Sequence, residues 1–210
     1  MREVAVLVHG IWMIGLEMVP LRRNLQRCGL ECHQFFYRSL INTPQLNAAR
    51  LDRFLRKIDA DIIHLVAHSL GGIVVLHLFE QAPLQKPGRV VMMGTPLNGC
   101  EIARRLHRLV ITRPLLGRSV VRGLLGDRPA WKAPRELGMI AGTKGIGMGS
   151  LVFGGLESPS DGTVRVSETY SPEVYAHLCV PFSHAGMLWS PEVAAAICRF
   201  LRSGDFAGGA

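Results

Sequence analysis

The sequence predicts an α/β fold, a doubly wound and mostly parallel sheet of about six strands with helices on both faces. Short, continuously apolar segments alternate with longer segments of helical periodicity, which is typical of parallel strands buried on both faces. The 210 residues suffice for one sizeable domain. Apolar residues make up 48% of the chain and charged residues 19%, a balance that excludes a disordered chain.

The first half of the chain alternates strand and helix. Thr43 can cap the helix that starts at Pro44, and the later apolar residues of that helix recur with a period that places them on one face. Gly29 ends the helix before it. The expected strands are Val4–Val8, Glu31–Tyr37 and Ile62–His68, and the expected helices are Glu17–Cys28, the segment that starts at Pro44, and Leu70–Gln81.

The second half continues this alternation with one interruption. Residues 97–136 are too long for an ordinary connection, and we expect two short helices there, Glu101–Ile111 and Leu115–Leu125, broken at Pro114. The sequence thus predicts a single domain over 1–202, with 97–136 as a basic helical insertion and 203–210 as a flexible tail. The other expected elements are strands at Arg89–Gly94, Leu137–Thr143 and Tyr175–Val180, short strand pieces at Leu151–Phe153 and Thr163–Val166, and a helix at Pro191–Leu201.

The cysteines and the N-terminus predict a cytoplasmic protein. Five cysteines cannot all pair within one chain, so reduced thiols are the simplest interpretation. Cys28 and Cys32 lack a second pair at metal-binding spacing, so we expect no zinc. The apolar run Val4–Val8 is shorter than the core of a secretory signal. The uncharged stretch 62–79 contains histidines and a Gly-Gly pair, which argue against a membrane span.

Positive charge is concentrated in the insertion. The net charge is +8, and the segment from Cys100 to Glu136 holds nine basic and three acidic residues. Such a segment can attract phosphate, an anionic membrane or an acidic partner, or it can form a solvated surface. We expect no nucleic-acid binding, because aromatic residues are not interleaved with the basic ones.

The segment Val66–Gly72 predicts a nucleophile elbow at Ser69. A strand ends there, a helix begins, and the small residues Ala67 and Gly71 flank the serine at the positions where larger side chains would collide. The hydroxyl would then stand where the free N–H groups of a helix start face developing negative charge. The alternative is that Ser69 simply caps the helix.

The turn after the first strand can supply an oxyanion hole. Gly10 permits a tight turn, after which the backbone N–H of Ile11 can point toward Ser69. This N–H and that of Leu70 would together form an oxyanion hole with two hydrogen-bond donors. The alternative is a simple turn.

Asp161 and His184 are the candidate partners of Ser69, because a serine hydroxyl needs a base and an orienting acid. Both follow predicted strands, so both can reach the cleft beyond the carboxyl ends of the sheet. The alternatives are an Asp-Gly turn and a surface histidine. His68 adjoins the serine but faces the other side of the strand, so it is not the expected base.

From 4 to about 201 the chain resembles the α/β-hydrolase superfamily, most closely small bacterial lipases and lipase-like esterases. The resemblance rests on His9-Gly10, on Ala67 to Gly71, on Gly94-Thr95-Pro96, on Asp161 to Val164, and on His184, with the nucleophile, acid and base in the order of that superfamily. It implies Ser69, Asp161 and His184 as catalytic residues, backbone donors at Ile11 and Leu70, no cofactor and no metal. Ala67 replaces the usual first glycine.

The predicted function is hydrolysis of carboxylic esters through an acyl-enzyme. Apolar residues near the proposed site, among them Trp12, Met13 and Leu188, could contact an apolar acyl chain, or they could be ordinary loop packing. Lipases often carry a lid where the insertion lies, and an amphipathic basic helix there would suit an anionic membrane surface or an anionic substrate. Acyl transfer to another acceptor, thioester cleavage and a non-catalytic binding role remain the alternatives.

Overall fold

The computed structural model describes residues 1–146 and 156–207, and in these ranges it contains one six-stranded sheet. Every strand pair is parallel, and the strand order is β2-β1-β3-β4-β5-β6. The predicted fold class is therefore confirmed. The strands are β1 (Glu3–Val8), β2 (Glu31–Phe35), β3 (Ile62–His68), β4 (Val90–Met93), β5 (Leu137–Gly142) and β6 (Ala176–Val180).

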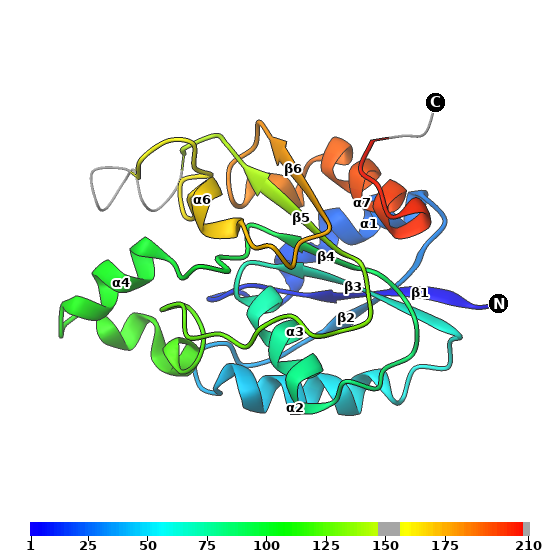
Figure 1. Cartoon of the computed structure of the whole chain (residues 1–210), viewed down its shortest axis with the longest axis horizontal. Coiled ribbons are helices and arrows are strands. Elements are labelled where there is room, and N and C mark those ends of the chain that lie inside the picture. Colours follow the sequence, from blue (N-terminus) through cyan, green and yellow to red (C-terminus); the bar gives the residue numbers. More distant parts are fainter. Residues whose placement is uncertain (147–155, 208–210) are drawn as a thin grey trace.

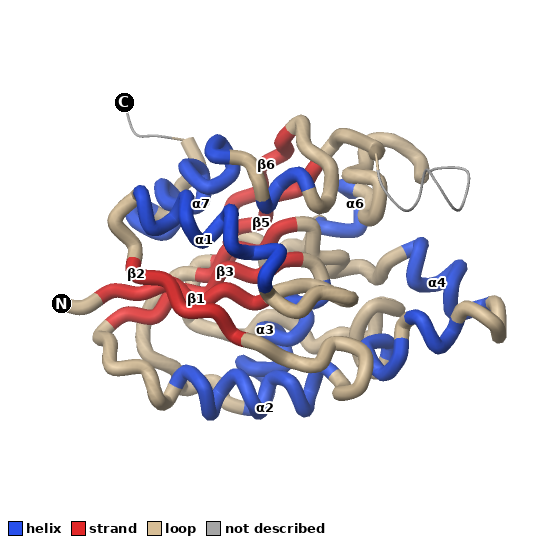
Figure 2. Tube along the Cα trace, turned by 180° about the vertical axis from the view of Figure 1, so that it is seen from behind, coloured by secondary structure: helices blue, strands red, loops and turns tan. Residues whose placement is uncertain are grey.

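Helices cover both faces of the sheet, as Figures 1 and 2 show. α1 (Val19–Arg27), preceded by the 3₁₀ turn η1 (Leu16–Met18), and α7 (Pro191–Ser203) pack together on one face. α2 (Pro44–Leu55) and α3 (Leu70–Gln81) pack together on the other. The expected cap is present, because Leu46 N–H donates to Oγ1 of Thr43 over 3.3 Å.

Alternation along β1 divides the core into two apolar clusters. Val4, Val6 and Val8 face the cluster under α2 and α3, while Ala5 and Leu7 face the cluster under α1 and α7. All five side chains are fully buried, as expected for a strand with helices on both sides. This burial fixes the register of the central strands. Because β1, β3 and β4 are parallel neighbours, their carboxyl ends lie at one edge of the sheet.

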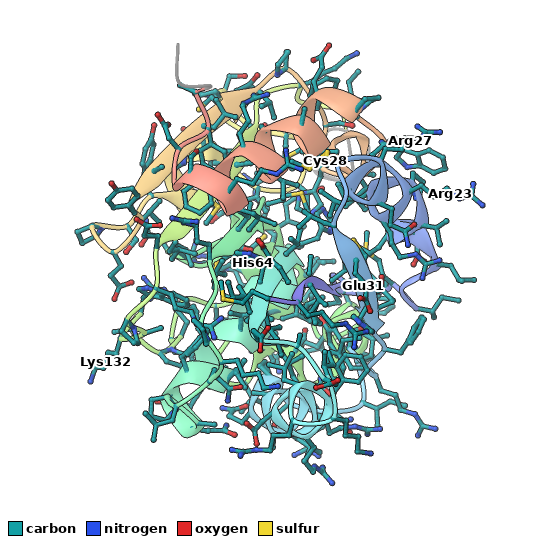
Figure 3. The ribbon with its side chains drawn as sticks, turned by 90° about the vertical axis from the view of Figure 1, so that its right-hand side faces the viewer. Arg23, Arg27, Cys28, Glu31, His64 and Lys132 are labelled. Carbon is teal, nitrogen blue, oxygen red and sulfur yellow. A yellow bond between two sulfur atoms is a disulfide. The ribbon has the colours of Figure 1, made fainter. Side chains whose placement is uncertain are left out.

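A disulfide joins Cys28, at the end of α1, to Cys198 in α7. Figure 3 shows Cys28 beside α7. The prediction that all five thiols are reduced is therefore wrong for this pair, since α1 and α7 pack side by side although 170 residues separate the two cysteines. The remaining cysteines, Cys32, Cys100 and Cys179, are free.

The insertion contains one α-helix and two 3₁₀ turns. α4 (Glu101–Arg108) is followed by η2 (Arg113–Leu115) and η3 (Gly117–Val120). The helix α4 lies at the end of the molecule opposite the N-terminus (Figures 1 and 2). The predicted helix Leu115–Leu125 is wrong. Gly117 has φ +53° and lies against the carbonyl of Leu40, and the Asp127 carboxylate accepts bonds from backbone N–H groups that a helix would use.

One further prediction needs correction near the C-terminus. Thr163–Val166 is not a strand, because Glu168 caps a short helix, α6 (Val166–Thr169), by accepting the N–H of Arg165 over 2.9 Å. The predicted strand piece Leu151–Phe153 lies outside the described residues. In the part of the expected flexible tail that is described, Phe206 is buried and stacks on Phe200 with ring centroids 4.7 Å apart.

None of the helices in the described ranges has the length and apolar character needed to cross a membrane.

Candidate functional site

Ser69 occupies the sharp turn between β3 and α3. Its backbone has φ 54° and ψ −122°, a conformation that a residue with a side chain seldom adopts. The residue is 5% exposed, and its side chain makes no capping hydrogen bond to α3, so the alternative role as a helix cap is not realised. Strain of this kind, at the end of a central strand, is the geometry of a nucleophile elbow.

Close packing explains the two glycines that follow Leu70 at the start of α3. A Cβ on Gly71 would lie 2.3 Å from the carbonyl oxygen of Val8 and 2.7 Å from that of His9. A Cβ on Gly72 would lie 2.2 Å from Oγ1 of Thr95. The start of α3 therefore rests directly on the end of β1, which brings the turn at His9 beside the serine.

Asp161 and His184 form a hydrogen-bonded pair. Asp161 lies in the connection from β5 to α6, and His184 lies between β6 and the 3₁₀ turn η4 (Gly186–Leu188). Nδ1 of His184 is 2.6 Å from Oδ2 of Asp161. The other oxygen of this carboxylate accepts the N–H groups of Thr163 and Val164 over 2.8 and 2.7 Å. Asp161 is 1% exposed, so its orientation is fixed.

The pair lies beside the end of β4. Gly94 has φ +56°, and a Cβ there would lie 2.9 Å from Nδ1 of His184 and 3.0 Å from Oδ2 of Asp161. Ser69 lies at the neighbouring strand end, where its N–H donates to the carbonyl of Met93 over 2.8 Å. The structure thus brings Ser69, Asp161 and His184 to one edge of the sheet. Among the described residues, no hydrogen bond joins Oγ of Ser69 to His184.

His68 contacts His184 directly, a role that the sequence analysis missed. Nε2 of His68 lies 3.0 Å from the carbonyl oxygen of His184, and the two rings are 4.5 Å apart. A carbonyl can only accept, so His68 carries its proton on Nε2. Complete burial lowers the pKa of His68 well below its ordinary value, and the neighbouring His184 lowers it further. The only available signal was its position next to the serine.

The turn at His9 is anchored by Tyr37, which the sequence analysis did not single out. The Tyr37 hydroxyl donates to the carbonyl of His9 over 2.6 Å, and the two rings stack 4.1 Å apart. Burial lowers the pKa of His9. Across residues 1–146 and 156–207, neither Ile11 nor Leu70 donates its backbone N–H to another residue. Both predicted oxyanion donors are therefore available.

A narrow apolar pocket opens beside Ser69. Its volume is about 30 Å³, far below the roughly 300–1,000 Å³ typical of small-molecule sites. Burial raises the pKa of the Cys100 thiol in its wall to about 12. The pocket is lined by Ile11, Trp12, Ser69, Pro96, Cys100, Ile102, Ala103, Leu106, Leu116, Leu124, Thr163 and Val164.

Of the three predicted acyl contacts, only Trp12 lines this pocket. Its indole N–H donates to the carbonyl of Leu115 over 2.6 Å, which ties the turn after β1 to the insertion. Met13 and Leu188 pack instead on the cluster under α1 and α7. Met13 folds back so that its sulfur accepts the N–H of Gly10, and Leu188 is buried in the 3₁₀ turn η4.

In the ranges that the structure describes, no group of three or more histidine, cysteine or acidic side chains could hold a metal ion.

Comparison with known structures shows the same fold in several hydrolases. A lipase from Bacillus licheniformis has a TM-score of 0.74 and 19% identity, covering 96% of this chain and 91% of the lipase. A phospholipase from Legionella pneumophila has a TM-score of 0.72 and 16% identity, covering 95% of this chain and 60% of its own. A pyrethroid hydrolase from Sphingobium faniae has a TM-score of 0.64 and 14% identity, and the match covers 96% of this chain and 98% of the pyrethroid hydrolase.

Comparison of the sequence with family models gives the same assignment. None of the curated proteins matches the sequence significantly. A model of the α/β hydrolase family, however, matches residues 5–201, almost the whole chain. That range includes the elbow at Ser69 and the pair formed by Asp161 and His184. The chain belongs to the α/β hydrolase family.

Proposed function

We propose that this protein is a serine hydrolase that cleaves carboxylic esters with an apolar acyl group. The observation that carries the proposal is the strained Ser69 at the same sheet edge as the hydrogen-bonded Asp161–His184 pair. A strained nucleophile and an oriented base are what acyl transfer to serine requires. The missing hydrogen bond between Ser69 and His184 is compatible with this role, because such bonds are often long in the absence of substrate.

In the proposed reaction, His184 takes the proton of Ser69 as the serine oxygen attacks the ester carbonyl. The N–H groups of Ile11 and Leu70 stabilise the resulting oxyanion. The carbonyl re-forms, and His184 protonates the departing alcohol. His184 then activates a water molecule, which attacks the acyl-enzyme and releases the acid. Asp161 holds the imidazole in the tautomer with its proton on Nδ1.

The pocket supports an apolar acyl group. Its walls are mostly aliphatic, and one of them is the inner face of α4, formed by Ile102 and Leu106. The expected helix Glu101–Ile111 is shorter in the structure, since α4 ends at Arg108, and Leu109 and Val110 are exposed. Because the pocket is so narrow, we propose that the insertion moves as a lid when substrate binds.

We infer that the protein works in an oxidising compartment. The expected cytoplasmic location depended in part on reduced thiols, and the Cys28–Cys198 disulfide removes that part of its support. Disulfides form and persist in oxidising surroundings. The proposed reaction uses the side chains and backbone of this chain and calls for no cofactor.

A fluorophosphonate probe tests the nucleophile. We expect the wild type to be labelled at Ser69, and we expect Ser69→Ala to lose labelling and on the order of 10⁶ in kcat on p-nitrophenyl esters. Asp161→Asn should lower kcat by about 10⁴, because the imidazole would then favour the wrong tautomer. Rates should rise with acyl length until the pocket is filled.

Circular dichroism of each variant provides the control for folding. A folded wild type that reacts with neither probe nor ester would contradict the proposal and favour a binding role. Labelling at Ser69 without ester hydrolysis would contradict the substrate class instead. Transfer to added alcohols and cleavage of acyl thioesters would then identify the acceptor.

A further inference from the structure

The exposed tip of the insertion is unusually apolar. Leu109, Val110 and Ile111 follow one another and are 54%, 75% and 88% exposed. Leu115 is also exposed, at 50%. Single exposed aliphatic residues are normal on a protein surface, whereas a contiguous group marks an interaction site. We call the exposed residues Arg108–Ile111, Arg113, Leu115 and Arg118 the insertion tip.

The charged residues of the segment that carries this tip are all basic. From 102 to 126 the sequence has six arginines and no acidic residue. In the described part of the chain, the guanidinium groups of Arg108 and Arg118 have no carboxylate partner, whereas Arg122, farther along, pairs with Glu80 over 2.6 Å. The tip therefore combines protruding aliphatic side chains with uncompensated cations.

The tip lies next to the pocket beside Ser69. The opposite, buried face of α4 lines that pocket, and so does Leu116, the residue that follows Leu115. Trp12, which also lines the pocket, donates its indole N–H to the carbonyl of Leu115. Figures 1 and 2 place α4 at the end of the molecule where the strand carboxyl ends lie. A surface that meets the tip would therefore lie close to the pocket.

We propose that the insertion tip docks the protein on an anionic lipid bilayer. Aliphatic side chains at Leu109–Ile111 would enter the boundary between headgroups and acyl chains, while Arg108, Arg113 and Arg118 would contact lipid phosphates. A nucleic acid would satisfy the arginines but not the aliphatic residues, and the tip has no aromatic side chain to stack on bases. Docking depends on this surface and not on the proposed chemistry.

Vesicle flotation of the full-length Ser69→Ala variant tests docking without hydrolysis. We expect binding to vesicles of phosphatidylcholine mixed with phosphatidylglycerol, weakened by high salt, and much less binding to phosphatidylcholine alone. Arg118→Glu should weaken the partition coefficient by about fivefold or more, the contribution of one interfacial arginine. Ile111→Asp should weaken it at least as much.

Two matched substitutions far from the tip serve as controls. Leu84 is 90% exposed in the loop after α3, and Arg23 is exposed on α1, where Figure 3 shows it pointing into solvent. Leu84→Asp and Arg23→Glu should leave flotation unchanged.

The outcomes separate docking from catalysis. Equal flotation on neutral and anionic vesicles, or equal losses in tip and control variants, would overturn the docking proposal. Flotation of Ser69→Ala together with an unreactive wild type would leave docking standing and refute the proposed chemistry. Ester hydrolysis by a wild type that does not bind vesicles would support the proposed chemistry and refute docking.

Discussion

At Ser69, neighbouring residues hold a conformation that costs about 1–3 kcal/mol on its own. The Ser69 N–H donates to Met93, and its carbonyl accepts the Thr95 hydroxyl over 2.9 Å and the Gly72 N–H over 3.0 Å. Thr95 is fully buried, so its bond is shielded from water. The strain is therefore offset by contacts from β4 and α3, and the hydroxyl of Ser69 stays free for other partners.

His68 should act as a positioning residue for His184. Its Nε2–H holds the carbonyl of His184, and its ring packs against the imidazole. His68→Leu should lower kcat about tenfold with little change in KM, since it removes one buried hydrogen bond. His68→Gln, whose amide can donate to the same carbonyl, should recover part of the loss. Steady-state kinetics on a p-nitrophenyl ester would measure both.

A purely structural role for His68 would give a different pattern. KM and kcat would then change together, or neither variant would differ from the wild type after correction for the folded fraction. Circular dichroism and active-site titration with the fluorophosphonate probe provide that correction.

Among the elements, the contact between the start of α3 and the end of β1 does most to shape the site. Gly71 permits it, because any side chain there would run into the carbonyls of Val8 and His9. The first of these carbonyls belongs to the last residue of β1, and the second, just after β1, accepts the Tyr37 hydroxyl, so neither can move independently. The turn that carries Ile11 is thereby held close to Ser69.

Gly71→Ala should therefore displace β1 from α3. We expect a loss of about 1–3 kcal/mol in the free energy of unfolding, the usual result of overpacking, together with a fall in kcat. Gly145→Ala is a matched control, because the nearest atom would be 3.6 Å away, at ordinary contact distance. Urea unfolding and ester kinetics would compare the two, and equal effects would argue against the close contact.

The sequence predicted the elements with strong local signals. The continuous apolar strands, the Thr43 cap and the residues flanking Ser69 depend on neighbours in the chain, and all six strands of the predicted parallel sheet are present. The helix predicted at Leu115–Leu125 was wrong, because the conformation there depends on contact between Gly117 and the distant Leu40. Tyr37 and His68 were also missed, since their roles arise only once β2 pairs with β1 and the loop that carries His184 packs against the end of β3.

Across the whole molecule, the two core clusters bury several histidines along with the apolar side chains. His9, His64 and His68 are each almost fully buried, and burial lowers the pKa of each. Near His64, Glu3 opposes the shift, while Arg89 and Arg135 add to it. These histidines are therefore neutral in the folded protein at pH values where the unfolded chain would bind protons.

Stability should fall as the solution is acidified below pH 6.5, the ordinary histidine pKa. There the unfolded state binds more protons than the folded state, so the free energy of unfolding decreases with falling pH, by about 1.4 kcal/mol per pH unit for each histidine that stays neutral. Thermal unfolding between about pH 7.5 and pH 5.5 would measure this. A flat profile would contradict it, and His68→Gln should reduce the slope.

The Cys28–Cys198 bond closes residues 28–198 into a covalent ring, joined between the first and last α-helices. Ser69, Asp161, His184 and the insertion all lie inside that ring. A protease that nicks one peptide bond within it would leave a single molecule, with both pieces still attached. The break would become visible on a gel only after a reducing agent is added, and the protein can therefore survive a cut in its exposed insertion without losing either half.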